Sequence, residues 1–197
     1  MSGAIVLQFH AFKPRLFMSI SRLQIENLDD RHPGLLPSTA ANYLDAARVC
    51  LDLHHTPPTD FTLSNNNQTT QTELNWTPTD NRCRNAWANL EDATRDGAYA
   101  LALAAIEQLR GFVAIRRAQS RTGADYYVVP IGQDPEDLEN CYRLEISGTN
   151  LGNSVIKQRL REKLIQAQKG DSPLPAIAAV VGFREKVIII QTVEDTL

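Results

Sequence analysis

The order of regular segments between residues 81 and 193 limits the fold of this chain more than any other feature of its sequence. Residues 81–110 are rich in Ala and Leu, which predicts one long helix that ends at Gly111. We expect strands at 112–119, 124–131 and 141–147, a helix at 153–169, and strands at 175–183 and 186–193. Short connections between the first three strands favour an antiparallel meander, and the helix then carries the chain back to the sheet. The predicted fold class is an α/β sandwich with a mixed sheet.

The first 79 residues are expected to form an extension in front of that core, which we take as residues 80–197. A helix is predicted at 38–54, with Ser38 as its N-cap. The pair Pro57-Pro58 marks the stop of this helix, because proline cannot continue a helical hydrogen-bond ladder.

The rest of the extension has weaker signals. The polar run SNNNQTTQT at 64–72 predicts an exposed loop, since it has nothing to bury. Its flanks at 60–63 and 73–76 are short apolar-containing segments that are compatible with a hairpin. Residues 18–36 are expected to be mostly irregular.

Composition disfavours several classes of protein. The net charge of −3 and the pI of about 5.8 argue against a protein that coats nucleic acid by charge alone. The longest strongly apolar stretches, 98–106 and 176–183, fall far short of the ~20 residues needed to cross a bilayer, so we expect no membrane association. The three cysteines form no C-x-x-C spacing, which favours a reducing, cytoplasmic setting over a disulfide framework or a zinc site. Both Met1 and Met18 remain possible as the natural start.

Two acidic residues lie in the predicted meander at positions that bring them together. Along 141–147 alternate residues face opposite sides of the sheet, so Arg143, Glu145 and Ser147 share one face. Asp125 lies at the start of the preceding strand, which is beside the end of the next strand in an antiparallel pair. Two neighbouring carboxylates repel unless a positive charge lies between them. A divalent cation is one solution, and hard oxygen ligands favour Mg²⁺ or Mn²⁺.

The same geometry selects neighbours for this carboxylate pair. Gln119 ends the strand before Asp125, so it is expected close to that carboxylate. A strand of eight residues spans about 26 Å, which a helix covers in about 17 residues. Counting back along the predicted helix therefore places the region of Glu91 and Asp92 level with the carboxylates.

Basic residues near the pair suggest a phosphate-binding face. Lys157 and Arg161 lie one turn apart near the start of the helix at 153–169, and a helix N-terminus favours phosphate. Residues 110–122 hold four Arg and no acidic residue. The candidates for nucleic-acid contact are Arg116, Arg117, Arg121, Lys157 and Arg161.

This arrangement resembles the PD-(D/E)XK nuclease superfamily over about residues 81–193. The core of that family is a restriction-endonuclease-like order of helix, three strands, helix and strand. Its metal ligands are an Asp at the start of the second strand and the Glu of an E-x-K motif in the third. The resemblance implies metal binding by Asp125 in Gly123-Ala124-Asp125 and by Glu145 in Glu145-Ile146-Ser147. A carboxylate of the first helix often assists in that family, and its match here is Glu91, with Asp92 as the second choice.

One position departs from the family pattern. Ser147 stands where the family has Lys, which positions the attacking water and stabilises charge at the phosphate. In some members this Lys comes from the following helix, so the resemblance implies a catalytic set of Asp125, Glu145 and Lys157. The implied function is a Mg²⁺- or Mn²⁺-dependent nuclease of the kind that serves restriction, repair or anti-phage defence. The segments RTGADYYV and RLEISG also resemble small uncharacterised bacterial proteins.

Two other interpretations stay open. Asp125 and Glu145 could form ordinary ion pairs with Arg116, Arg117 or Arg143 on a solvated sheet face. Alternatively, the same fold could serve as a non-catalytic subunit that holds a protein partner, a second copy of itself or a nucleic acid. Ser147 and the acidic pI favour this second interpretation, in which residues 1–79 form the docking arm.

Overall fold

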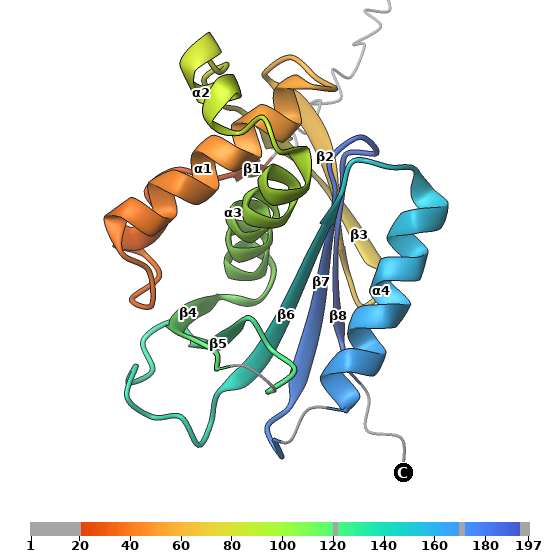
Figure 1. Ribbon diagram of the computed structural model, residues 1–197. Helices are drawn as coiled ribbons and strands as arrows, with labels where there is room; N and C mark the ends of the chain where they lie inside the picture. The colour runs from red at the N-terminus through yellow and green to blue at the C-terminus, as the bar shows by residue number, and fades with distance from the viewer. Residues whose placement is uncertain (1–20, 120–121, 170–171, 194–197) are drawn as a thin grey trace, which may run out of the picture.

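A mixed β-sheet forms the centre of the protein in the computed structural model, which describes residues 21–119, 122–169 and 172–193 (Figure 1). The strands are β1 Ser21–Leu23, β2 Thr59–Asn65, β3 Gln68–Leu74, β4 Phe112–Arg117, β5 Tyr126–Pro130, β6 Tyr142–Thr149, β7 Ala176–Gly182 and β8 Val187–Thr192. The helices are α1 Pro37–Asp52, α2 Asn81–Ala86, α3 Leu90–Arg110 and α4 Asn153–Gln168, with a short 3₁₀ turn at Leu28–Asp30. Within these described ranges no helix is both long and apolar enough to cross a bilayer.

The sheet order is β1-β3-β2-β8-β7-β6-β5-β4. β4, β5 and β6 form the expected antiparallel meander, and α4 returns the chain so that β7 pairs parallel with β6. α3 lies against one face of the sheet and α4 against the other, while α1 packs on the outer side of α3 (Figure 1). The predicted α/β class with a mixed sheet is confirmed.

The polar run at 64–72 is not a loop, and this expectation was wrong. It forms the end of β2, a two-residue turn at Asn66-Asn67 and most of β3. Both turn residues have positive φ, 46° and 70°, which Asn tolerates and which a tight hairpin requires. The first four residues of β3 are exposed, so their polarity is compatible with a strand.

The N-terminal strands belong to the same sheet as the rest of the chain. β2 pairs parallel with β8, and β3 pairs parallel with β1. Among the described residues 21–36, β1 and the 3₁₀ turn are the regular elements, so this segment is mostly irregular, as expected. Met1 and Met18 lie outside the described residues.

Two helix boundaries differ from the predictions. α1 begins at Pro37 with Leu36 at the N-cap position, so Ser38 lies inside the first turn and does not cap the helix. The predicted helix at 81–110 is two helices, because the Asn89 side chain accepts a hydrogen bond from the Glu91 amide at 3.0 Å and starts α3. α3 ends as expected at Gly111, which adopts φ 64°.

Small residues allow α3 to lie between α1 and the sheet. Most of its fully buried positions are small, namely Ala93, Gly97, Ala98, Ala100, Ala102 and Ala105. A Cβ atom at Gly97 would lie 2.8 Å from backbone atoms of Ala47 in α1. A Cβ atom at Gly148 in β6 would lie 2.5 Å from the carbonyl oxygen of Thr94. The first turns of α3 are therefore held directly on the second half of β6, where the candidate site lies.

The loop at 32–34 covers the outer edge of β4 and forms hydrogen bonds with it. The buried His32 accepts a hydrogen bond at Nδ1 from the Ala114 amide at 2.9 Å, and Gly34 donates to the Ala114 carbonyl at 2.9 Å. Burial lowers the pKa of His32 from 6.5 to about 4, against the opposing attraction of Glu107. The imidazole is therefore held neutral.

Replacing His32 with Asn is expected to make the free energy of unfolding less sensitive to acid. Between pH 6.5 and 4 the unfolded chain binds a proton at His32 that the folded protein does not, so the folded state is fully favoured above pH 6.5 and loses stability as the pH falls. This loss amounts to about 3 kcal/mol at pH 4. Urea unfolding at pH 7, 5.5 and 4 should show that the wild type loses this much more than His32→Asn. Parallel pH profiles for the two proteins would contradict the assignment.

Candidate functional site

A cleft of about 690 Å³ opens where β5 and β6 separate. β5 pairs only with the first part of β6, from Tyr142 to Leu144, and the Asp125 amide adds one more hydrogen bond to the Leu144 carbonyl at 2.8 Å. The second half of β6 forms the floor of the cleft, and the first turns of α3 and the inner face of α4 form its walls. The lining residues used below are Glu91, Asp92, Arg95, Tyr99, Asp125, Glu145, Ser147, Arg159 and Lys163.

Asp125 and Glu145 lie opposite one another at the point where the strands separate. The antiparallel register ends at the pair Tyr126–Leu144, so Asp125 and Glu145 are the next residues along the two strands. The predicted neighbourhood of these two carboxylates is therefore present in the structure. Their interaction is electrostatic as well as geometric, because Asp125 helps to raise the pKa of Glu145.

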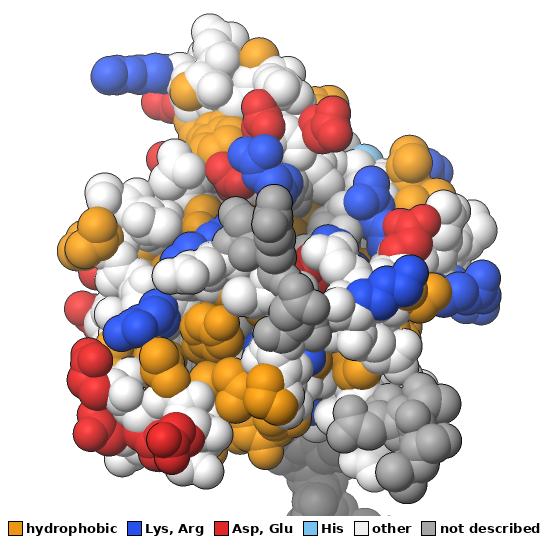
Figure 2. Space-filling view, turned by 60° about the horizontal axis from the view of Figure 1, so that its bottom comes forward, with side chains coloured by type: hydrophobic (Ala, Val, Ile, Leu, Met, Phe, Trp, Pro, Cys, Tyr) orange, Lys and Arg blue, Asp and Glu red, His pale blue; other side chains and the backbone are white. Residues whose placement is uncertain are grey.

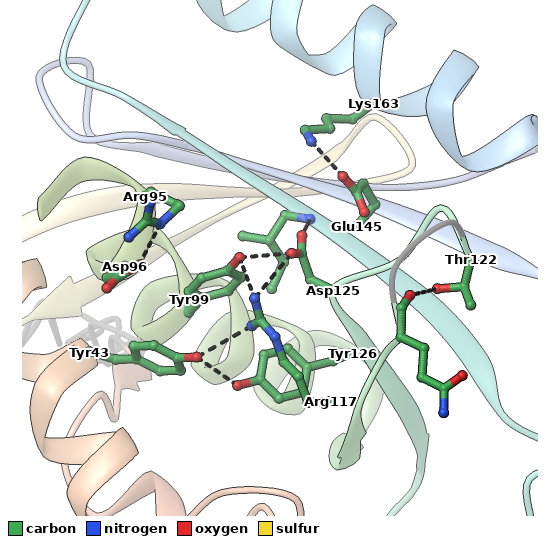
Figure 3. Close-up of polar contacts among 12 residues, drawn as sticks. Tyr43, Arg95, Asp96, Tyr99, Arg117, Thr122, Asp125, Tyr126, Glu145 and Lys163 are labelled. Carbon is green, nitrogen blue, oxygen red and sulfur yellow. Dashed lines mark hydrogen bonds and ion pairs between the residues drawn. The ribbon is translucent and has the colours of Figure 1, made fainter. Parts of the chain in front are cut away.

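Asp125 is held in one orientation by three donors (Figure 3). Its Oδ1 accepts a hydrogen bond from the Tyr99 hydroxyl at 2.7 Å, and its Oδ2 accepts one from the Ile146 amide at 2.7 Å. An Arg117 nitrogen lies 3.5 Å from Oδ1. The carboxylate is thereby fixed between α3 and the free edge of β6.

Glu145 is buried, with 4% of its side chain exposed, and it is paired with a lysine. Lys163 Nζ donates to Glu145 Oε1 at 2.5 Å from the inner face of α4 (Figure 3). Burial, followed by Asp125, raises the pKa of Glu145, and Lys163 opposes that rise. The cleft lining therefore holds two neighbouring carboxylates, and one of them, Glu145, is paired with the Lys163 ammonium group.

The lysine of the cleft is Lys163, whereas the sequence led us to Lys157. Arg159, Lys163 and Gln166 of α4 line the cleft, and they share one face at helical spacing. Lys157 and Arg161 each lie two positions from Arg159, about 200° around the helix, and both are exposed outside the cleft. The sequence did contain a sign of this role, because Lys163 lies on the same helical face as the apolar residues Leu160 and Ala167.

Arg117, which was expected to contact nucleic acid, instead binds tyrosine side chains and Asp125 within the protein. Its guanidinium carbon lies 4.4 Å from the centre of the Tyr99 ring and 4.8 Å from that of Tyr126. Its nitrogens donate to the hydroxyls of Tyr99 at 2.9 Å and Tyr43 at 3.3 Å. Arg117 therefore fixes the surroundings of Asp125, as the ion-pair interpretation of the sequence allowed.

The other basic candidates lie elsewhere. Arg116 is exposed at the edge strand and lies 3.6 Å from Glu136. Arg143, the third possible ion-pair partner, is buried and donates to the carbonyls of Thr122, Ala167 and Leu174. Arg121 lies outside the described residues. In the face shown in Figure 2, a group of acidic side chains lies at the lower left, whereas basic side chains are scattered over the rest of the face.

The remaining candidates divide between the cleft and its surroundings. Glu91 and Asp92 line the cleft from the start of α3, and Ser147 lies in its floor. Gln119 follows Ala118, whose amide donates to the Asp125 carbonyl at 3.0 Å, yet the Gln119 side chain is exposed and outside the cleft. Its backbone therefore lies close to that of Asp125, as expected, whereas its side chain does not line the cleft.

The three carboxylates expected to bind a metal, Asp125, Glu145 and Glu91, do not form one cluster. Asp125 and Glu145 are adjacent, whereas Glu91 comes from the wall of the cleft. Among the described residues, no group of three or more His, Cys, Asp or Glu side chains is arranged to hold a metal ion. The structure therefore contains a carboxylate pair with a nearby ammonium group.

Comparisons with known proteins add no family to this description. No protein-family model matches the chain, and no curated protein or solved structure is significantly similar to it.

Proposed function

We propose that the protein is a divalent-metal-dependent hydrolase of nucleic-acid phosphodiesters, and that the cleft beside β6 is its active site. One observation carries this proposal. Asp125 and Glu145 lie next to the last paired residues of β5 and β6 and line the same cleft, and Lys163 contacts Glu145 at 2.5 Å. Paired carboxylates with an adjacent cation are the groups needed to bind a hard metal ion and a phosphate together.

The cleft carboxylates provide oxygen ligands of the kind that Mg²⁺ and Mn²⁺ prefer. A carboxylate offers about four acceptor positions, and the two close hydrogen bonds to Asp125 leave its other positions open. Asp125 and Glu145 would hold the ion, with Glu91 or Asp92 in the same cleft as a further carboxylate. When bound, the ion would supply an activated water and neutralise charge on the phosphate.

The protein's own residues would position the substrate around this pair. Tyr99 and the Ile146 amide keep Asp125 oriented, which fixes one side of the site. Lys163 would donate to a phosphate oxygen, because its ammonium group lies at the floor of the cleft beside Glu145. It would thus take the part that Ser147 leaves open in the E-x-S motif, in place of the expected Lys157.

A second function is favoured by the existing ion pairs. Glu145 is paired with Lys163 and Asp125 with Arg117, so both carboxylates already have positive partners. A cleft neutralised in this way suits a non-catalytic subunit that holds nucleic acid or a protein partner. We place either function in the cytoplasm, in a restriction or anti-phage role, as a proposal that the nuclease-like sequence pattern supports.

Incubation of the protein with single- and double-stranded DNA and RNA tests the proposal. We expect cleavage in Mg²⁺ or Mn²⁺, and complete loss of cleavage in excess EDTA with recovery when the cation is restored. Cleavage that persists in EDTA would reject the metal-dependent mechanism. Binding without cleavage in either cation would favour the non-catalytic subunit.

A further inference from the structure

Arg159 differs from the other cationic side chains that line the cleft. Arg95 lies 3.0 Å from Asp92 and 2.8 Å from Asp96, and Lys163 lies 2.5 Å from Glu145. Among the described residues, Arg159 has no carboxylate within ion-pair distance, and its contact is a 3.3 Å hydrogen bond to the neutral Ser147 hydroxyl. Its positive charge is therefore available to an anion in the cleft.

The position of Arg159 matches the geometry of the floor below it. Arg159 precedes Lys163 by four residues on α4, a rise of about 6 Å along the helix. Their partners Ser147 and Glu145 are two residues apart on β6, a distance of about 6.6 Å along the strand. The two cations are therefore spaced along the cleft as their partners are, and they form a row parallel to β6.

We propose that Arg159 binds a second phosphate, next to the one held at Lys163, on the same nucleic-acid strand. This inference rests on the proposed function and makes the substrate a polymer of phosphodiesters with at least two phosphates in the cleft. Arg is suited to this contact because its guanidinium group binds phosphate through two parallel hydrogen bonds. Ser147 is then a positioning residue, since its hydroxyl holds the guanidinium group over the floor.

Binding of a short fluorescent phosphorothioate oligonucleotide, which resists cleavage, tests this assignment in Mg²⁺ by anisotropy. Arg159→Ala is expected to weaken binding about 10-fold, the effect of one lost charged hydrogen-bond contact. The slope of log Kd against log salt should fall by about 0.7 for a single strand, because one phosphate contact is lost. Ser147→Ala should weaken binding less, and Arg159→Lys should recover part of the loss.

Lys157→Ala is the matched control, because Lys157 has the same charge on the same helix but lies outside the cleft. We expect this variant to bind like the wild type. If Arg159→Ala binds with the affinity and salt slope of the wild type, the second phosphate site is wrong, while cleavage by both proteins would leave the proposed function standing. If the wild type neither binds nor cleaves nucleic acid, the phosphate site and the proposed function are both wrong.

Discussion

Replacing Asp125 with Asn or Glu145 with Gln is expected to lower metal-dependent cleavage by at least about 100-fold. Loss of a residue that only orients a metal ligand costs 10- to 100-fold in many metalloproteins, so loss of a ligand charge should cost at least the upper value. Both substitutions keep the size of the side chain, and the amide introduced by Asp125→Asn retains an oxygen that can accept from the Ile146 amide. Rates of oligonucleotide cleavage at saturating Mg²⁺ measure the effect.

Glu162→Gln provides the matched control for these two variants. Glu162 lies on the exposed side of α4, outside the cleft, and accepts a hydrogen bond from Gln158 at 2.8 Å. Its replacement removes one negative charge from the same region of the protein and should leave the rate unchanged. Full cleavage by the Asp125 or Glu145 variant would show that the carboxylate pair is not the catalytic centre.

Replacing Lys163 with Met is expected to destabilise the fold by about 4 kcal/mol at pH 7, because it leaves Glu145 buried without its partner. The double variant Lys163→Met/Glu145→Gln should regain most of this loss, since no charge then remains at the site. Guanidinium unfolding of the wild type, both single variants and the double variant measures the coupling between the two residues.

The effect of Lys163→Met should also depend on pH. Burial raises the pKa of Glu145 above its ordinary value of 4.5, so the folded protein retains this proton to a higher pH than the unfolded chain. This contribution favours folding below pH 4.5 and is lost as the pH rises through the folded-state pKa. The destabilisation should therefore shrink as the pH is lowered from 7 toward 4.5. Lys157→Met, on the exposed side of α4, should show neither effect, and an equal loss in both variants would exclude a specific role for the Glu145–Lys163 pair.

The strand register explains why the carboxylate pair could be predicted from the sequence. Asp125 lies at the start of one strand and Glu145 near the end of the next, and an antiparallel connection leaves few ways to separate them. The level of Glu91 and Asp92 followed from the rise per residue of helices and strands, and both residues line the cleft. When the connecting loops are short, residue positions along the strands and helices thus predict which side chains lie close together in the site.

The contacts that depend on packing could not be predicted in this way. Lys163 is far enough along α4 that its meeting with Glu145 depends on how the helix crosses the sheet. Arg117 faces Tyr126 because a bulge between Ala114 and Arg116 shifts the register of β4 by one residue. The extent of the hairpin was underestimated, because the turn at Asn66-Asn67, rather than the composition of its strands, determines where the strands end.

Calorimetric titration with Mn²⁺ of the wild type and of the double variant Asp125→Asn/Glu145→Gln tests the central claim most directly. Both substitutions keep the size of the side chains, so a difference in binding reports chiefly on the two negative charges. We expect the wild type to bind Mn²⁺ at one site and the double variant to show no binding in the same range. Equal binding by the two proteins, or no binding by the wild type at millimolar Mn²⁺, would contradict a metal site at this carboxylate pair.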